Sequence, residues 1–354
     1  MLTGRAATAA IAAGDALPFL GGSPAMPLAF ARAKILVRVG EAVAEAHLGA
    51  AGLAAWIAGL PAPLGQRFAA QRERLTRLRP SFAGLPSERW PLVMGIVNVT
   101  PDSFSDGGRF LDPASAIAHG RALRAAGATL LDVGGESTRP GAAPVPEALE
   151  RDRVLPVIEA LARDGAVVSV DTRRASVMRA ALDAGARIVN DVTGLTGDPA
   201  SADLVRARAV PTVLMHMQGT PRTMQAAPRY AHAALDVLEW CEGRLTALGA
   251  ADAPAQARFA VDPGIGFGKT LEHNLVLFAH LAMLHATGAP VLLGASRKSF
   301  IANLAPDAPA DGRLPGSLAA VLAALLAGVQ IVRVHDVAET VQALDVARAI
   351  LAAG

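Results

Sequence analysis

Eight short apolar runs recur along residues 92–337, and each of them carries a polar or charged residue at or near its end. In chain order they are LVMGIVNVT (92–100), TLLDVGGE (129–136), AVVSVDT (166–172), RIVNDVT (187–193), PTVLMHM (211–217), RFAVDPG (258–264), PVLLGAS (290–296) and IVRVHDV (331–337). Short continuous runs of Val, Ile and Leu indicate strands that are buried on both faces, because helices cover both sides of a parallel sheet. The pattern therefore predicts eight parallel strands.

Segments of helical character separate these runs, for example at residues 112–127, 173–185, 271–284 and 315–328. Alternating strands and helices favour parallel βαβ units, and about 245 residues is close to the usual size of a (β/α)8 barrel. We therefore predict an α/β fold, a (β/α)8 TIM barrel over residues 91–354 with an N-terminal extension or small appended subdomain over residues 1–90. The active site of such a barrel lies at the C-terminal ends of the strands. The polar residues expected there are Asn98, Asp132, Asp171, Asn190, Asp191, His216, Asp262, Ser296, Arg333, His335 and Asp336.

Residues 1–90 lack this alternation and are rich in Ala, Gly and Pro. We expect a strand around AKILVRV, an apolar helix over residues 41–60 and a solvated Arg-rich helix face over residues 66–80. Three arrangements remain open for this part: packing on the bottom of the barrel, a small subdomain, or partial mobility. The alanine-rich start has the charge of a signal peptide, but Asp15 and several glycines interrupt its apolar region, so we expect no export.

The composition excludes several classes of protein. With 354 residues, of which 52% are hydrophobic and 18% charged, the chain can bury a large core. A net charge of +2 and an aromatic content of 4% offer neither a basic stripe nor a stacking platform, so we expect no nucleic-acid partner. We also expect no membrane span, because no stretch reaches roughly 18 unbroken apolar residues. Lone Cys241 cannot form an intramolecular disulfide, which fits a reducing, cytoplasmic location.

The loops after the first two runs carry the first candidate chemistry. Turn preferences explain the Pro, Asp, Ser and Gly residues of GIVNVTPDSFSDGG, but they do not explain Phe104 in the middle of the loop. In the second loop, GGESTRPGA, Thr138 and Arg139 stand between a glycine pair and Pro140. An arginine presents a fork of donors that suits carboxylate or phosphate, and glycines allow a ligand to approach closely. This loop indicates an anion clamp.

The third, fourth and eighth runs add groups for a heterocycle and for an anion. Asp171 and Asn190 suit the edge of a pterin or a purine, because a carboxylate accepts two N–H bonds and an amide both donates and accepts. Alternatively, such residues cap the helices that follow. Arg333 and His335 are two residues apart on a strand, so both point to the same side and, with Arg139, could hold a diphosphate.

The loops DPGIGFGKTLEHN and GASRKSF complete the ring with Asp262, Lys269, Ser296, Arg297 and Lys298. The first has glycines spaced as GxGxG rather than GxGxxG, so it does not favour a dinucleotide or nucleotide triphosphate site. The sequence contains no HExxH or GxSxG motif and no dense His and Cys cluster for structural zinc. Oxygen ligands near Asn98 could still hold Mg2+ against a phosphate, since this ion usually keeps several waters.

Taken together, these segments resemble the dihydropteroate synthase family of the folate pathway. The matching motifs, in family order, are GIVNVTPDSFSDGG, LDVGGESTRPGA, VSVDT, IVNDVTG, MHMQGTPRTMQ, DPGIGFGKT, GASRKSF and VRVHDV, over residues 92–337. The resemblance implies condensation of 6-hydroxymethyl-7,8-dihydropterin diphosphate with 4-aminobenzoate, which gives 7,8-dihydropteroate and diphosphate. It also implies small-molecule substrates and a homodimer, to which the apolar helices over residues 315–328 and 338–354 could contribute a face.

The resemblance also assigns roles to individual residues. The pterin is expected to bind Asp171, Asn190, Asp262 and Lys298, between walls formed by Met215, Phe267 and Gly294. The diphosphate is expected to bind Arg139, Arg333, His335 and, through Mg2+, Asn98. The 4-aminobenzoate site is expected to be bordered by Phe104, Thr138, Pro140 and Ser296, with Asp106 on the loop that closes over it. The expected catalytic residues are Asp171, Asp262, Lys298, Arg333 and His335.

Two alternative functions remain at this point. A methyltetrahydrofolate:corrinoid methyltransferase-like barrel would share the fold and the pterin clamp, but it would not need Arg139, Lys298, Arg333 and His335 to meet a diphosphate. A non-catalytic pterin-binding subunit would keep the fold and lose loop motifs that are all present here.

Overall fold

A computed structural model describes residues 1–19, 27–79, 81–86, 90–100, 113–139, 141–250, 255, 257–306, 308–309 and 311–353. Three residues with predicted roles, Phe104, Asp106 and Pro140, lie outside this described part. Each of the eight apolar runs contains a strand: β6 (Leu92–Asn98), β7 (Leu130–Gly134), β8 (Val168–Asp171), β9 (Ile188–Asp191), β10 (Thr212–Met215), β11 (Phe259–Asp262), β12 (Leu292–Gly294) and β13 (Ile331–Val334).

These strands form one parallel sheet that curls into a barrel. Its order is β11-β10-β9-β8-β7-β6-β13-β12, so neighbours in the chain are also neighbours in the sheet. The two ends of the sheet meet through a parallel bridge between Val261 and Val291, where the Val261 N–H donates to the Pro290 carbonyl at 2.9 Å. The predicted (β/α)8 barrel is confirmed.

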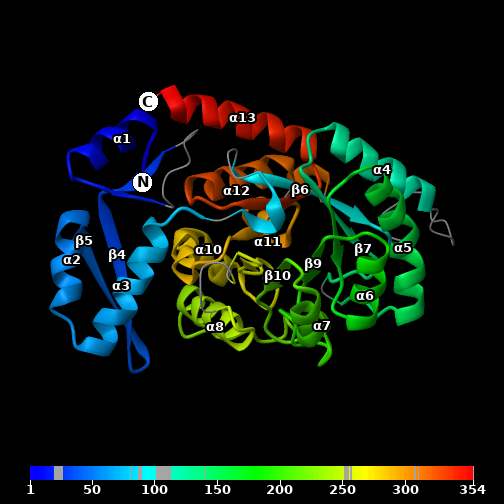
Figure 1. The fold of residues 1–354 in the computed structure, drawn as a ribbon, viewed down its shortest axis with the longest axis horizontal. Coiled ribbons are helices and arrows are strands. Elements are labelled where there is room, and N and C mark those ends of the chain that lie inside the picture. The colour runs from blue at the N-terminus through cyan, green and yellow to red at the C-terminus, as the bar shows by residue number, and fades with distance from the viewer. Residues whose placement is uncertain are drawn as a thin grey trace.

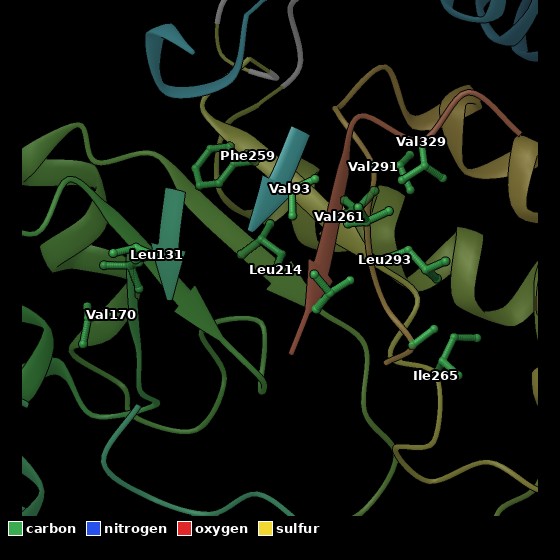
Figure 2. Packing of buried hydrophobic residues seen from close by; sticks show 14 of the residues in the cluster. Val93, Leu131, Val170, Leu214, Phe259, Val261, Ile265, Val291, Leu293 and Val329 are labelled. Atoms are coloured by element: carbon green, nitrogen blue, oxygen red, sulfur yellow. The ribbon is translucent and has the colours of Figure 1, made fainter. Parts of the chain in front are cut away.

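Helices surround the sheet on its outer side (Figure 1). They are α4 (Pro113–Ala125), α5 (Glu147–Arg163), α6 (Ala175–Asp183), α7 (Ser201–Arg208), α8 (Ala233–Ala247), α10 (Leu271–Ala279), α11 (Ser299–Leu304), α12 (Leu314–Leu326) and α13 (Val337–Ala353), with a 3-10 segment η3 (Leu281–Thr287) after α10. The main core lies between the sheet and these helices and includes Leu214, Val261 and Leu293 (Figure 2).

A second, smaller core fills the inside of the barrel at the N-terminal ends of the strands. It contains Met94, Ile188, Leu292 and their neighbours, while the alternate residues of the same strands belong to the outer core. Side chains alternate across a strand, so this division fixes which residues point into the barrel. Phe82 of a short 3-10 turn (Phe82–Gly84) and Leu85 pack on this inner cluster, so the segment that precedes the barrel closes its lower end.

Within its described residues, the N-terminal region contributes two small sheets and three α-helices. β1 (Leu2–Thr3), β3 (Leu28–Phe30) and β2 (Leu17–Pro18) pair antiparallel beside α1 (Gly4–Ala12). β4 (Arg32–Val39) and β5 (Ala42–Gly49) form a hairpin that is followed by α2 (Ala50–Ala58) and α3 (Ala62–Thr76). The expected strand around AKILVRV is β4.

The helix expected over residues 41–60 is wrong in its first half. Residues 42–49 form β5, which pairs with β4 at every position from Ala42 opposite Val39 to Gly49 opposite Arg32. Helical structure begins only at Ala50, and Leu53 and Ile57 then bury one face against Ile35 of the hairpin. The backbone hydrogen bonds offered by β4 override the weak helical preference of the alanine-rich residues 42–49.

The N-terminal region packs against the side of the barrel, with α1 next to α13 and α3 next to η3 (Figure 1). The side chain of Arg79 is almost completely buried. It links the N-terminal region to the barrel by donating hydrogen bonds to the Gly288 carbonyl at 3.1 Å and to the His285 carbonyl. None of the helices in the described ranges is long and apolar enough to cross a membrane.

Candidate active site

The last inward-pointing residues of the barrel strands form a polar layer at the C-terminal end of the sheet. The register pairs Asp171 with Asn190, Met215 with Asp262 and Gly294 with Arg333 across neighbouring strands. Asn98, half-buried, pairs with Gly134 and ends β6 in the same layer. The alternation of the strands thus places six of the predicted site residues, together with Asn98, at one barrel mouth.

Arg333 lies between two carboxylates inside this mouth. Its Nε donates to Asp132 Oδ2 at 2.6 Å, and its Nη2 donates to Asp171 Oδ2 at 2.7 Å. Asn190 Nδ2 donates to the same Asp132 oxygen at 2.9 Å. One buried carboxylate therefore orients both the guanidinium and the amide, and charge-assisted bonds of this kind are stronger than neutral ones.

Burial and the neighbouring charges set the ionisation of this group. Burial raises the pKa of Asp171 to about 7, although the Arg333 guanidinium opposes that rise. Burial alone would lower the pKa of Arg333, but the Asp132 and Asp171 carboxylates raise it, so the guanidinium stays charged. Arg333 is thus a permanent cation at the mouth, beside a carboxylate that takes up a proton near neutral pH.

Asp262 and Lys298 face the same space from β11 and from the loop after β12. Asp262 Oδ1 accepts from the Gly264 N–H at 2.7 Å, and burial raises the pKa of Asp262. Lys298 donates to the Ile265 carbonyl, and its Nζ lies 4.6 Å from the centre of the Phe267 ring. Burial lowers the pKa of Lys298 to about 8. A side chain at Gly294 would point at Asp262, with its Cβ 3.6 Å from Oδ2, so this glycine keeps the mouth open.

Lys269 joins the loop after β10 to the loop after β11. Its Nζ lies 2.9 Å from His216 Nδ1, 3.3 Å from the His216 carbonyl and 3.0 Å from the Phe267 carbonyl. Burial lowers the pKa of Lys269 to about 7 and that of His216 to about 3. Gly264 and Gly268, both with positive φ, touch the carbonyls of this neighbouring loop, where no side chain would fit. The spacing of the glycines therefore serves loop packing.

Ser296, His335 and Arg139 form the outer part of the mouth. The Ser296 hydroxyl lies 3.1 Å from His335 Nδ1 and accepts from the His335 N–H at 3.2 Å. Burial lowers the pKa of His335 to about 3, and the nearby cations Arg333 and Arg139 add to the effect, so the imidazole is neutral. Arg139 itself is exposed and Thr138 is half-buried. Arg139 and Arg333, beside a neutral imidazole, offer cationic donors that suit an anion.

A buried ion network holds the loop that carries Thr138 and Arg139. The Glu136 carboxylate forms ion pairs with Arg173 at 3.0 Å and with Arg174 at 3.1 Å. It also accepts a hydrogen bond from the Val145 N–H at 2.9 Å. Glu150, fully buried on α5, pairs with Arg174 and accepts from Thr172 at 2.6 Å. The network ties the loop after β7 to the loop after β8.

Several strand-end residues serve the fold instead of the mouth. Asp191 points outward and accepts from the Thr193 N–H and hydroxyl, each at 2.7 Å, so it shapes its own turn. Arg297 forms a two-bond pair with Asp336, with Nε 3.0 Å from Oδ2. His216 belongs to the buried contact with Lys269.

Asp132 belongs to the mouth, although the sequence predicted no specific role for it. The sequence places it at a strand end, but its hydrogen bonds to Arg333 and Asn190 join strands that are far apart in the sequence. Its position two residues before Gly134, on the inward side of β7, was the available signal. The described residues contain no cluster of three or more His, Cys, Asp or Glu side chains that could hold a metal ion.

The fold and this mouth define an α/β-barrel enzyme that binds a polar heterocycle and an anionic group. The model of the pterin binding enzyme family matches residues 94–335. Among curated proteins, the dihydropteroate synthase of Escherichia coli (strain K12) is 46% identical, over 74% of this chain and 93% of its own length. That of Mycobacterium leprae is 47% identical, over 74% and 94%.

Comparison with solved structures gives the same family. A Yersinia pestis dihydropteroate synthase with a sulfonamide drug complex has a TM-score of 0.71 at 43% identity, covering 77% of this chain and 99% of its own. A Xanthomonas albilineans dihydropteroate synthase in complex with 7,8-dihydropteroate has a TM-score of 0.67 at 45% identity, covering 76% and 96%. The chain belongs to the dihydropteroate synthases, a family of pterin binding transferases.

Proposed function

We propose that the barrel mouth condenses 6-hydroxymethyl-7,8-dihydropterin diphosphate with 4-aminobenzoate to 7,8-dihydropteroate and diphosphate. The observation that carries this proposal is the gathering of Asp171, Asn190, Asp262, Lys298 and Arg333 at one mouth, in a chain of this family. No observation of the site favours the methyltransferase or the non-catalytic alternative.

The pterin is proposed to bind deep in the mouth. Asp262 and Asn190 offer an acceptor and an amide for the ring edge, and Lys298 offers an ammonium donor. Met215, Phe267 and Gly294 would form the walls, and the absence of a side chain at Gly294 leaves room for a flat ring above Asp262.

The diphosphate is proposed to bind the outer part of the mouth. Arg333 and Arg139 provide fork-shaped donors, and His335 would gain a proton because an anion beside it raises its pKa. Asn98 provides a half-buried amide oxygen at the end of β6. A lone oxygen ligand fits Mg2+, which is usually held by one or two protein oxygens together with substrate phosphates. When bound, the ion would neutralise charge on the leaving diphosphate.

The chemistry would follow from these placements. The bond between the pterin methylene carbon and the diphosphate oxygen breaks first, and both electrons leave with the oxygen. Ionised Asp171 and Asp262 then face the positive charge on the pterin methylene group, while Arg333 stays with the diphosphate. The 4-aminobenzoate nitrogen attacks the methylene carbon and afterwards releases a proton to solvent. No enzyme nucleophile is needed.

The 4-aminobenzoate is proposed to lie at the rim, beside Thr138 and Ser296. The further residues proposed to border or cover it are Phe104, Pro140 and Asp106, which lie outside the described part of the chain. The buried ion network around Glu136 and Glu150 supports this reading, because it fixes the position of the loop that carries Thr138.

The test is diphosphate release by the purified chain with the pterin diphosphate and Mg2+, with and without 4-aminobenzoate, and with the product identified by mass. We expect dihydropteroate only when both substrates are present, and loss of turnover with EDTA that added Mg2+ restores. Asp262→Asn and Arg333→Ala should each abolish most turnover with the melting transition intact. Arg163→Ala, on an exposed part of α5, is the matched control. Near wild-type rates in the first two variants would refute the assigned roles.

We also propose a homodimer in the cytoplasm. Val346 and Ile350 on α13 are 56% and 67% exposed, and Leu326 on the neighbouring α12 is also exposed. Burial of these side chains in a second copy would remove apolar surface from water. Sedimentation equilibrium of the wild type and Ile350→Asp is the test, and an unchanged mass for the variant would refute this face as the interface.

A further inference from the structure

A cavity of about 420 Å³ lies between the N-terminal region and the side of the barrel. Its walls come from β4, α2 and α3 on one side and from α8, the end of α10 and η3 on the other. These elements stand together beside the barrel in Figure 1, with the blue β4 and α3 facing the yellow-green α8. Its lining includes none of the residues of the proposed active site, so it is a separate feature of the molecule.

The body of the cavity is apolar. Ile35, Leu53 and Phe68 line it from the N-terminal region, and Leu238 and Met283 line it from the barrel. The volume of this cavity lies within the range of roughly 300–1,000 Å³ that is usual for small-molecule binding sites. Most such sites are lined by apolar side chains, with a few polar groups that orient the ligand.

The charged groups around this apolar body are mostly positive. Among the described residues, the lining contains five Arg or Lys side chains and one carboxylate: Arg32, Lys34, Arg38, Arg67, Arg72 and Glu239. Three of the cations have partners: Lys34 pairs with Glu45 at 2.7 Å, Arg38 with Asp236 and Glu239, and Arg67 with Glu242 at 3.2 Å.

Arg32 and Arg72 differ from these three. Neither forms an ion pair with a carboxylate anywhere in the residues that the structure describes. Arg72 lies on α3 and is half-buried, whereas Arg32 is exposed at the start of β4. Two unpaired guanidinium groups next to an apolar hollow are complementary to a ligand with an apolar body and an anionic head.

We propose that this cavity binds a free long-chain carboxylate, with its hydrocarbon chain between β4, α3 and η3 and its head group at Arg32 and Arg72. A neutral apolar ligand would leave both arginines without a partner. A second copy of the chain would have to insert a narrow apolar segment carrying a carboxylate into a concave site. A single amphiphile satisfies the shape and the charge together.

The experiment is a calorimetric titration of the full chain with dodecanoate below its micelle concentration. We expect saturable one-to-one binding, and no comparable binding of dodecyltrimethylammonium, which has the same chain and a cationic head. Arg32→Gln and Arg72→Gln should each weaken binding about tenfold, because each removes a charged hydrogen-bond partner of the head group. The matched control is Arg151→Gln, which changes an exposed arginine on α5.

A second variant tests the apolar part. Ala282→Phe on η3 places a ring in the cavity and should abolish binding, with the circular dichroism spectrum and the melting transition as checks of folding. If this variant fails to fold, the two arginine variants still decide the question. Three results would each overturn the proposal: no saturable binding, equal binding of the cationic amphiphile, or full affinity in both arginine variants. Binding only to vesicles, or dodecanoate-dependent dimerisation, would point to a membrane or a second copy and would also overturn it.

Discussion

Replacement of Lys269 by methionine tests whether this buried lysine holds the loops after β10 and β11 in place. The substitution keeps the unbranched side chain but removes three contacts of Nζ, those with His216 Nδ1, the His216 carbonyl and the Phe267 carbonyl. At a net value of about 1 kcal/mol for each hydrogen bond, these contacts contribute about 3 kcal/mol to the free energy of unfolding at a pH where the amine is neutral in both the folded and the unfolded chain.

The dependence of this loss on pH is the sharper part of the prediction. The pKa of Lys269 is lowered from 10.5 to about 7 in the folded chain, so between these values the unfolded chain binds the additional proton. The contribution of Lys269 to the free energy of unfolding therefore rises with pH between about 7 and 10.5. It is smallest below pH 7, where the buried amine carries a charge in the folded chain. The difference between wild type and Lys269→Met should grow by up to about 1.4 kcal/mol for each pH unit above 7.

Urea unfolding at pH 6.5, 7.5 and 8.5 measures this difference, and the effects of titrating groups remote from Lys269 cancel between the two proteins. The exposed Lys34 provides the matched control, since Lys34→Met removes a surface ion pair that is worth at most about 1 kcal/mol. We also expect the KM for the pterin diphosphate to rise, because Phe267 moves with the loop. A stability difference that does not change with pH would refute the assignment of a buried, weakly basic lysine.

Three further predictions concern the mouth and its loops. Asp132→Asn should lower kcat at least tenfold, about 1.4 kcal/mol of activation free energy, because the guanidinium of Arg333 loses a charged acceptor; a wild-type kcat would show that Asp132 is not needed for positioning. The pH profile of kcat/KM should rise through about 7 as Asp171 loses its proton and fall above about 8 as Lys298 loses its own, and a flat profile between pH 6 and 9 would contradict both roles. Gly264→Ala should destabilise the fold by more than about 1 kcal/mol, because φ is +67° and the new Cβ would overlap a carbonyl oxygen. Gly243→Ala, within α8 and with open space around it, should stabilise the fold slightly. Urea unfolding of both variants measures the two changes in stability.

Much of the barrel and part of its mouth could be predicted because the signal is local. The eight apolar runs each contain a strand, since a parallel strand covered by helices must be apolar on both faces. The alternation along each run then places Asp171, Asn190 and Asp262 on the inward side once the direction of one strand is known. The resemblance to dihydropteroate synthases rested on the same loops and is confirmed by the family match.

Other features depended on contacts between distant parts of the chain. Residues 42–49 read as helix in isolation and form a strand because β4 offers them hydrogen bonds. Asp132 gained a role only when Arg333, some 200 residues later, came within 2.6 Å of it. Arg297 and Arg333 both lie near strand ends in the sequence. In the structure Arg297 pairs with Asp336, whereas Arg333 pairs with Asp171 inside the mouth.

The sequence by itself determined the strand and helix alternation, the motifs and the family, because these follow from residue types at short spacing. The tertiary structure decided which charged side chains form ion pairs, which have no ion-pair partner among the described residues and which are buried away from solvent. The pKa values of Asp171, Lys269 and His335, and the cavity between the N-terminal region and the barrel, follow from burial and from neighbours that are remote in the chain. Desolvation and pairing depend on three-dimensional proximity, which no local pattern of residues encodes.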